Sequence, residues 1–240
     1  MAAQGAISPP ADDCCRPAGV LADVPAPFRR AFELLAVLRS APAFHPDGVL
    51  YEGRAEVRGD GPLPPGEVDC LVRLSKGIGT PRGTGDLLGI AVRLLHDLPV
   101  DVLCTTAPGS EGWRRYLLVP RSAWSGATMT SLMWWRSPAG ERLQVVVQAP
   151  DAGLDSPEPE VLLDRLPVTF TLRVVGPAGE VQSGAIRVDR RSGLARPDFD
   201  PVLHSPLPWR LAPRWMAALR ARAYVGSRAG QARVPSDRAV

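Results

Sequence analysis

Short segments in which apolar and polar residues alternate constrain the fold of this chain more than any other feature. In VDCLVRLSK (68–76), positions 68, 70, 72 and 74 are apolar and the positions between them are more polar, so a strand there has two unlike faces. Gly, Pro and Asp separate such segments at hairpin-length intervals, which favours an antiparallel meander over a βαβ fold. The sequence predicts eight strands, at 48–57, 68–76, 87–95, 100–106, 114–120, 141–150, 168–176 and 180–189.

Helical spacing of apolar residues occurs near the two ends. Phe28, Phe32 and Leu35 predict an amphipathic helix from Pro25 onward, and Leu219 lies on one face of a second helix near the C-terminus. An antiparallel barrel of about eight strands is just wide enough to be filled by side chains or to hold one small ligand. The predicted fold class is therefore α+β, an antiparallel barrel of about eight strands with an N-terminal and a C-terminal helix.

A single domain accommodates this whole pattern, because β-barrel folds routinely use a length of 240 residues for one domain. We expect a flexible leader over 1–24, a barrel domain over 25–229 and a disordered tail over 230–240.

Charge and cysteine usage limit the environment and the partners. The net charge is only +3, and Lys76 is the only lysine, so the arginines do not by themselves indicate a nucleic-acid partner. The N-terminus lacks the features of a secretory signal, and no window approaches the ~18 apolar residues of a membrane span. The four cysteines form no CxxC pair, which indicates reduced thiols and no structural zinc. We expect a cytoplasmic protein with no membrane span, and we leave self-association into a homo-oligomer open.

The first candidate for chemistry is His45, in FHPDGVLYEG (44–53), directly before a turn and a strand. Its unperturbed pKa of about 6.5 suits general acid or base work near neutral pH. The alternative interpretation is a loop histidine bonded to the backbone.

The second candidate is the pair Arg73 and Ser75, which share one strand face because they are two positions apart. A serine beside a histidine can fix its tautomer, and an arginine can neutralise an anionic ligand group. An ordinary barrel strand with a polar face is the alternative.

The third candidate is the pair Arg220 and Tyr224, four residues apart on the final predicted helix and therefore on one side of it. A tyrosine, with a pKa of about 10, serves as an anionic iron ligand only when something stabilises the phenolate, as a nearby arginine does. The alternative is a surface pair.

Together, in this order, these motifs resemble the haem-dependent catalase family, whose segments read roughly R-x-x-H-A-x-G, V-R-F-S, D-x-R-G-F-A-V-K-F and D-L-V-G-N-N-T-P. The matching segments here are the histidine before the first strand, VRLS, GDLLGIAVRLL and DVLCTTAP. The Arg-x-x-x-Tyr near the C-terminus is similar to the motif that supplies the proximal haem ligand. The resemblance spans about residues 40–108 and 214–228.

This resemblance implies a catalase-like barrel that binds haem b. His45 would be the distal histidine, Ser75 its hydrogen-bond partner and Arg73 a contact to a haem propionate. Tyr224 would be the axial ligand of the iron, a recognised mode of haem ligation, and Arg220 would keep the phenol ionised.

Two positions depart from the family pattern. Pro42 replaces the arginine three residues before the histidine, and Thr105 replaces the distal asparagine. A threonine donates one hydrogen bond but lacks the reach of an amide, so it positions peroxide less well. We therefore expect a haem-binding protein that is at most a weak peroxidase, acting on hydrogen peroxide or organic peroxides.

A hydrolase of the phosphodiesterase type is one alternative. Metal-dependent phosphoester cleavage needs clustered His, Asp or Glu ligands. His45, His96 and His204 are scattered, and only DFD (198–200) hints at a carboxylate pair.

A barrel without enzymatic activity that binds an apolar small ligand is the other alternative. Trp134 and Trp135, with Met133 before them, can line its mouth. The competing interpretation of these aromatic residues is packing in the core.

Overall fold

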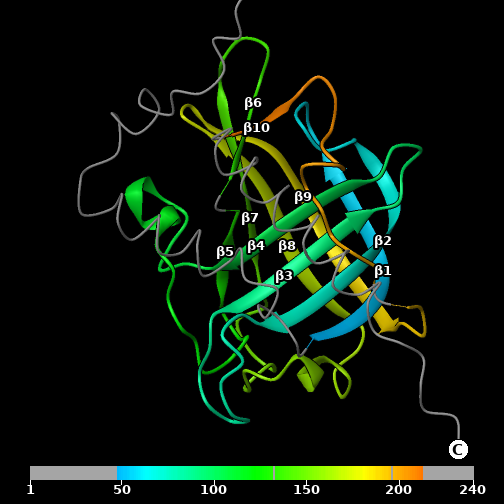
Figure 1. The fold of residues 1–240 in the computed structure, drawn as a ribbon, viewed down its shortest axis with the longest axis vertical. Coiled ribbons are helices and arrows are strands. Elements are labelled where there is room, and N and C mark those ends of the chain that lie inside the picture. Colours follow the sequence, from blue (N-terminus) through cyan, green and yellow to red (C-terminus); the bar gives the residue numbers. More distant parts are fainter. Residues whose placement is uncertain (1–47, 132, 196, 213–240) are drawn as a thin grey trace, which may run out of the picture.

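Ten antiparallel strands form the framework of the chain that the computed structural model describes, residues 48–131, 133–195 and 197–212 (Figure 1). Eight of them close into a barrel in the order β1-β2-β3-β4-β5-β7-β8-β9, because β9 pairs with β1. β10 pairs with β6, and β6 pairs with one end of β7. The strands are β1 Gly48–Arg58, β2 Gly66–Lys76, β3 Leu88–Leu94, β4 Val100–Thr106, β5 Thr128–Thr130, β6 Trp134–Arg136, β7 Arg142–Gln148, β8 Val168–Gly176, β9 Gly179–Arg191 and β10 Arg210–Ala212.

The predicted antiparallel barrel is confirmed, but the α+β class is wrong for this part of the chain. The described residues form an all-β fold, and their only helical elements are the short 3-10 helices η1 (Gly112–Tyr116) and η2 (Pro159–Leu162). The predicted N-terminal and C-terminal helices lie outside the described residues. The class differs because helical spacing is confined to the two ends of the sequence, whereas the residues between them alternate with the period of a strand.

The predicted strand at 114–120 is also wrong. Its apolar run has a strand-like composition, but β5 occupies the ladder beside β4, where Thr106 pairs with Met129. The run therefore keeps only single contacts, such as the bond from the Val119 N–H to the Thr106 carbonyl at 3.1 Å. β5, β6 and β10 were not predicted, because three residues are too few to show an alternating pattern.

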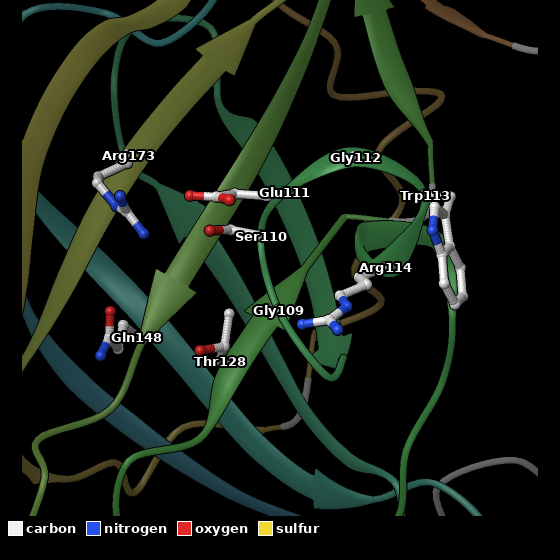
Figure 2. A pocket seen from close by; sticks show the side chains of 9 residues that line it. All are labelled: Gly109, Ser110, Glu111, Gly112, Trp113, Arg114, Thr128, Gln148 and Arg173. Carbon is white, nitrogen blue, oxygen red and sulfur yellow. The ribbon is translucent and has the colours of Figure 1, made fainter.

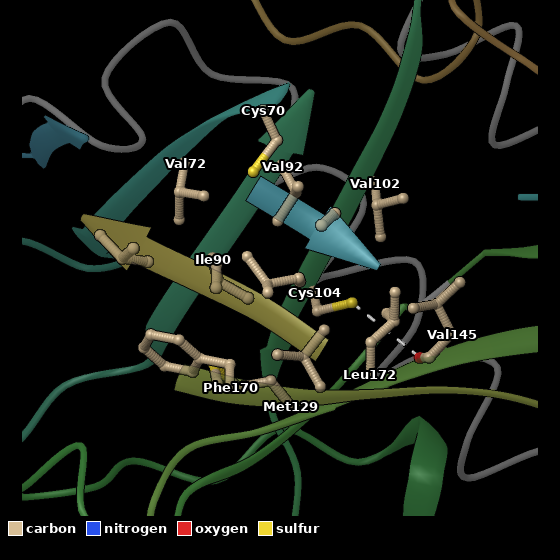
Figure 3. Close-up of a cluster of buried hydrophobic side chains, with 14 of the residues drawn as sticks. Cys70, Val72, Ile90, Val92, Val102, Cys104, Met129, Val145, Phe170 and Leu172 are labelled. Carbon is tan, nitrogen blue, oxygen red and sulfur yellow. Dashed lines mark hydrogen bonds between the residues drawn. The ribbon is translucent and has the colours of Figure 1, made fainter. Parts of the chain in front are cut away.

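Side chains that point inward fill the barrel. Figure 3 shows part of this core, where Val72, Ile90, Phe170 and Leu172 meet from β2, β3 and β8. Trp124, in the loop before β5, is fully buried within the same cluster. Burying each side chain of this size stabilises the fold by about 1.5–3 kcal/mol. The barrel interior is thus the hydrophobic core.

The seam between β1 and β9, where the barrel closes, depends on two glycines. A Cβ on Gly53 would lie 1.9 Å from the Arg187 carbonyl oxygen, and one on Gly184 would lie 2.0 Å from the Glu56 carbonyl oxygen. The register also shifts between Glu52 and Gly53, as at a β-bulge. Only glycine permits the two backbones to approach this closely.

A carboxylate organises the turn between β2 and β3. Asp86 accepts hydrogen bonds from the backbone N–H groups of Ile78, Gly79 and Thr80 at 2.8–2.9 Å, and from the Thr80 hydroxyl at 2.8 Å. Burial raises the pKa of Asp86, but these hydrogen bonds lower it by more, so the pKa lies below the ordinary value. The folded state therefore favours the ionised carboxylate.

No helix among residues 48–212, with positions 132 and 196 left out, is long and apolar enough to cross a membrane.

Gly184→Ala is expected to lower the free energy of unfolding by about 2–3 kcal/mol, because the added methyl group must push the two strands of the seam apart. Gly193→Ala is the matched control, since a Cβ there meets no atom within 4 Å, and we expect a change of less than about 1 kcal/mol. Urea denaturation followed by circular dichroism measures both. Equal effects of the two substitutions would contradict the role of the seam.

Asp86→Asn is expected to lower the free energy of unfolding at pH 7 by about 1–3 kcal/mol, because an amide nitrogen faces N–H donors. Since the folded-state pKa is depressed, the carboxylate stabilises the fold above its ordinary pKa of 3.8, and this stabilisation is lost as pH falls through the folded-state pKa. The difference between wild type and variant should therefore shrink below about pH 4. Asp164→Asn, in an exposed turn, is the control. A difference independent of pH would refute this account.

Candidate functional site

A row of small residues crosses four neighbouring strands of the barrel. Gly48 of β1 pairs with Ser75 of β2, Ser75 pairs with Gly89 of β3, and Gly89 pairs with Thr105 of β4. Paired residues of antiparallel strands point to the same face, so the two hydroxyl groups and the two glycines share one surface. We call these four residues the small-residue row.

The small-residue row lies on the outer face of the barrel. The neighbours of its members along the strands, Leu74, Ile90 and Cys104, belong to the interior core. Ser75 and Thr105 nevertheless are only 4% and 3% exposed. The row is therefore a buried part of the outer wall.

Arg73 extends along this row. It belongs to the next row of the same face, with Leu50, Ala91 and Leu103 as its cross-strand neighbours. Its guanidinium lies over Gly48, where a Cβ would be 2.7 Å from the Arg73 Nη2 atom. Arg73 is only 7% exposed, so the absence of a side chain on Gly48 makes room for a buried cation beside the hydroxyl groups.

The two hydroxyl groups are oriented by backbone carbonyls of β3. The Ser75 Oγ donates to the Gly89 carbonyl at 3.4 Å, and the Thr105 Oγ1 donates to the Leu88 carbonyl at 3.2 Å. A hydroxyl that donates a hydrogen bond keeps two lone pairs as acceptors. The Thr105 oxygen can therefore accept a hydrogen bond from another group at this face.

The structure brings together three of the six residues predicted from the sequence. Arg73, Ser75 and Thr105 lie in two adjoining rows of one face. His45, Arg220 and Tyr224 lie outside the described residues. The chain reaches the row at Gly48, three residues after His45 in the sequence.

Gly48 and Gly89 were not predicted to belong to the site. Both stand inside the quoted motif segments, and their spacing from the polar residues was the available signal. The signal was missed because a glycine becomes informative only when the register shows what lies beside it.

A charged cluster lies on the same face, at the end of β3 and β4 opposite to the small-residue row. The Arg93 guanidinium donates two hydrogen bonds of 2.7 Å to the fully buried Asp101 carboxylate, and the pKa of Arg93 is raised by this contact. The Asp200 N–H donates to the same carboxylate at 2.6 Å, and the His204 Nδ1 lies 2.9 Å from it. Segment 198–204 is thereby fixed to β3 and β4.

Phe199 is the apolar contact of that segment. It packs with Leu50, Leu71 and Ala91 on the outer face, and the Arg93 guanidinium lies 5.3 Å from its ring centroid. Phe199 therefore covers the middle of this face, and the small-residue row lies next to the covered area, toward the Gly48 end of β1.

The sequence DFD (198–200) hinted at a carboxylate pair, but its two aspartates form hydrogen bonds that hold segment 198–204 in place. The Asp198 carbonyl accepts a hydrogen bond from Arg93, and Asp200 Oδ1 accepts from the N–H groups of Val202 and Leu203. Both aspartates thus take part in the structure of the segment.

The two adjacent tryptophans have different environments. Trp135 is 2% exposed and belongs to the core. Trp134 is half-buried, meets Tyr116 edge to face at 6.0 Å, and lies under the Arg142 guanidinium at 5.5 Å. These contacts agree with the packing interpretation of the pair.

The outer face of β1–β4 carries a buried guanidinium that lies over Gly48, two hydroxyl groups, and a position without a side chain at Gly89. Guanidinium groups pair with carboxylates, and glycines permit a flat molecule to approach the backbone closely. In the part of the chain that the structure describes, no three His, Cys, Asp or Glu residues gather so as to hold a metal ion. No protein-family model matches the chain, and no curated protein matches it.

Phe199→Ala is expected to lower the free energy of unfolding by about 3 kcal/mol, because it leaves a cavity over the outer face. Leu203→Ala is the matched control in the same segment, since Leu203 is 62% exposed, and should change stability by less than about 0.5 kcal/mol. Urea denaturation of both variants tests this. If both variants lowered the free energy of unfolding by the same amount, the packing of Phe199 on the outer face would not be the source of the stabilisation.

Proposed function

We propose that this protein binds haem over the outer face of β1–β4 and acts at most as a weak peroxidase. The observation that carries the proposal is the register that unites Arg73, Ser75 and Thr105. These residues come from two segments of the sequence, VRLS and DVLCTTAP, each of which resembles a motif of the catalase-like family. Their meeting in one buried patch is what a shared ligand site requires.

The chemistry of this face fits haem in two respects. A flat macrocycle needs a surface without bulky side chains, and the position without a side chain at Gly89, between Ser75 and Thr105, supports this. Haem also carries two carboxylates, and the buried Arg73 guanidinium suits one of them.

Haem, when bound, supplies redox-active iron for the reduction of peroxides. Tyr224 would hold the iron of the haem through its phenolate oxygen. Arg220 stabilises the negative charge of that phenolate and so favours its ionised form.

His45 is the proposed acid and base of the reaction, and moves a proton between the oxygens of the peroxide. Ser75 would fix the tautomer of the imidazole through a hydrogen bond. Reduction of one hydrogen peroxide to two waters takes two protons and two electrons, and a small reducing substrate supplies the electrons. Thr105 offers a shorter hydrogen-bonding group than an amide, which is the reason to expect weak activity.

Purified protein titrated with haemin should develop a Soret band and a high-spin ferric spectrum of the tyrosinate type. Tyr224→Phe should abolish that spectrum. Arg73→Gln should weaken haemin binding by roughly 10- to 100-fold, because a hydrogen bond to a charged group is worth about 1.5–3 kcal/mol. Oxidation of a phenolic donor by hydrogen peroxide measures the activity of the reconstituted protein.

Arg187→Gln is the matched control, because Arg187 lies on the outer face of β9 and pairs with Asp189, and its neighbour on β1 is Arg54, six positions from Gly48. It should leave the haemin titration unchanged. Haemin binding that is equally insensitive to Arg73→Gln and Tyr224→Phe would overturn the proposal. Cleavage of a model phosphodiester that requires added divalent metal, in protein that gives no Soret band, would favour the hydrolase.

A further inference from the structure

A second polar site lies on another arc of the barrel, where the outer wall of β5, β7 and β8 faces the loop that carries η1. The cleft between them has a volume of about 510 Å³. Thr128, Gln148 and Arg173 form its wall on the strands, and segment 109–114 forms the opposite side (Figure 2). Thr128 pairs with Gln148 across β5 and β7, so the wall is set by the strand register.

Two arginines from elements far apart in the sequence reach into this cleft. Figure 2 shows the guanidinium of Arg173, from β8, and that of Arg114, from η1, directed toward the space between them. Arginines elsewhere on the barrel meet carboxylates, as Arg187 does with Asp189 at 2.8 Å. Within the described residues, the side chains of Arg114 and Arg173 form no hydrogen bond or ion pair.

The balance of charge in the cleft is positive. Arg114 and Arg173 contribute two positive charges and Glu111 contributes one negative charge, which leaves a net charge of +1. Arg173 is half-buried, so its cation is less screened by water than those of the open surface. A negatively charged ligand is therefore the species that this lining attracts.

The remaining lining suits an organic molecule better than a bare ion. Thr128 and Gln148 offer a hydroxyl and an amide, which donate and accept hydrogen bonds. Trp113, at the side of Arg114, offers an aromatic surface that is 59% exposed. The volume lies in the range of about 300–1,000 Å³ that small-molecule sites occupy.

We propose that this cleft binds a small organic oxyanion, with a carboxylate or phosphate group between Arg114 and Arg173. Guanidinium groups bind both kinds of group through paired N–H donors. Thr128 and Gln148 bind polar atoms of the ligand at the strand wall. This site is independent of haem, because none of its residues belongs to the outer face of β1–β4.

Benzoate and phenyl phosphate are the probes, because each joins an aromatic ring to one of the two oxyanions. Isothermal titration calorimetry of the full chain should detect binding of at least one, and the comparison identifies the preferred group. Benzamide, which has the same ring without the charge, should bind at least about tenfold more weakly.

Arg173→Gln and Arg114→Gln should each weaken binding of the preferred probe, by about tenfold for the half-buried Arg173 and by less for the exposed Arg114. Glu111→Gln should tighten binding by about two- to fivefold, because it removes a repulsive charge. A misfolded protein would not show this gain. Arg187→Gln, outside the cleft, should leave binding unchanged.

Failure of both probes to bind would overturn the proposal. An unchanged affinity in the double variant Arg173→Gln/Arg114→Gln would also overturn it, because the probe would then bind elsewhere on the protein. Far-ultraviolet circular dichroism and the Tm of each variant establish that the barrel is intact.

Discussion

The pairing register of β1–β4 is the constraint on which the rest of the structure depends. It sets Gly48, Ser75, Gly89 and Thr105 side by side, and it turns Leu74, Ile90 and Cys104 into the core at the same time. A slip of one residue in any of these strands would exchange the two faces. The hydrophobic core and the candidate site are therefore stabilised by the same interaction, because burying one face fixes the other.

Closure of the barrel gives the outer wall its separate sites. The seam at Gly53 and Gly184 joins β9 to β1, and side chains fill the interior, so both proposed sites lie on the outer surface. On one arc, Arg73 and two hydroxyl groups form the face that we propose for haem. On another, Arg173 and Arg114 border the cleft that we propose for an organic anion. The two proposed sites share no residue, so a substitution in one leaves the lining of the other unchanged.

The sequence predicted the long strands well, because seven or more residues are enough to show alternation. It failed where strands have three residues, as in Thr128–Thr130, and at 114–120, whose composition suits a strand although β5 occupies the neighbouring ladder. The predicted α+β class depended on terminal helical patterns, whereas the described residues are all-β. Local composition cannot show which segment pairs with a given strand, because segments far apart in the sequence can form the same pairing.

The sequence by itself determined that Arg73 and Ser75 share a face, because a strand repeats every two residues. It also determined the order of the motifs that resemble catalases. Only the tertiary structure decided that this face is the outer one, that Gly89 separates Ser75 from Thr105, and that Arg114 meets Arg173 across a cleft. The physical reason is that periodicity is a local property of the chain, whereas register and barrel closure arise from contacts between residues far apart in the sequence.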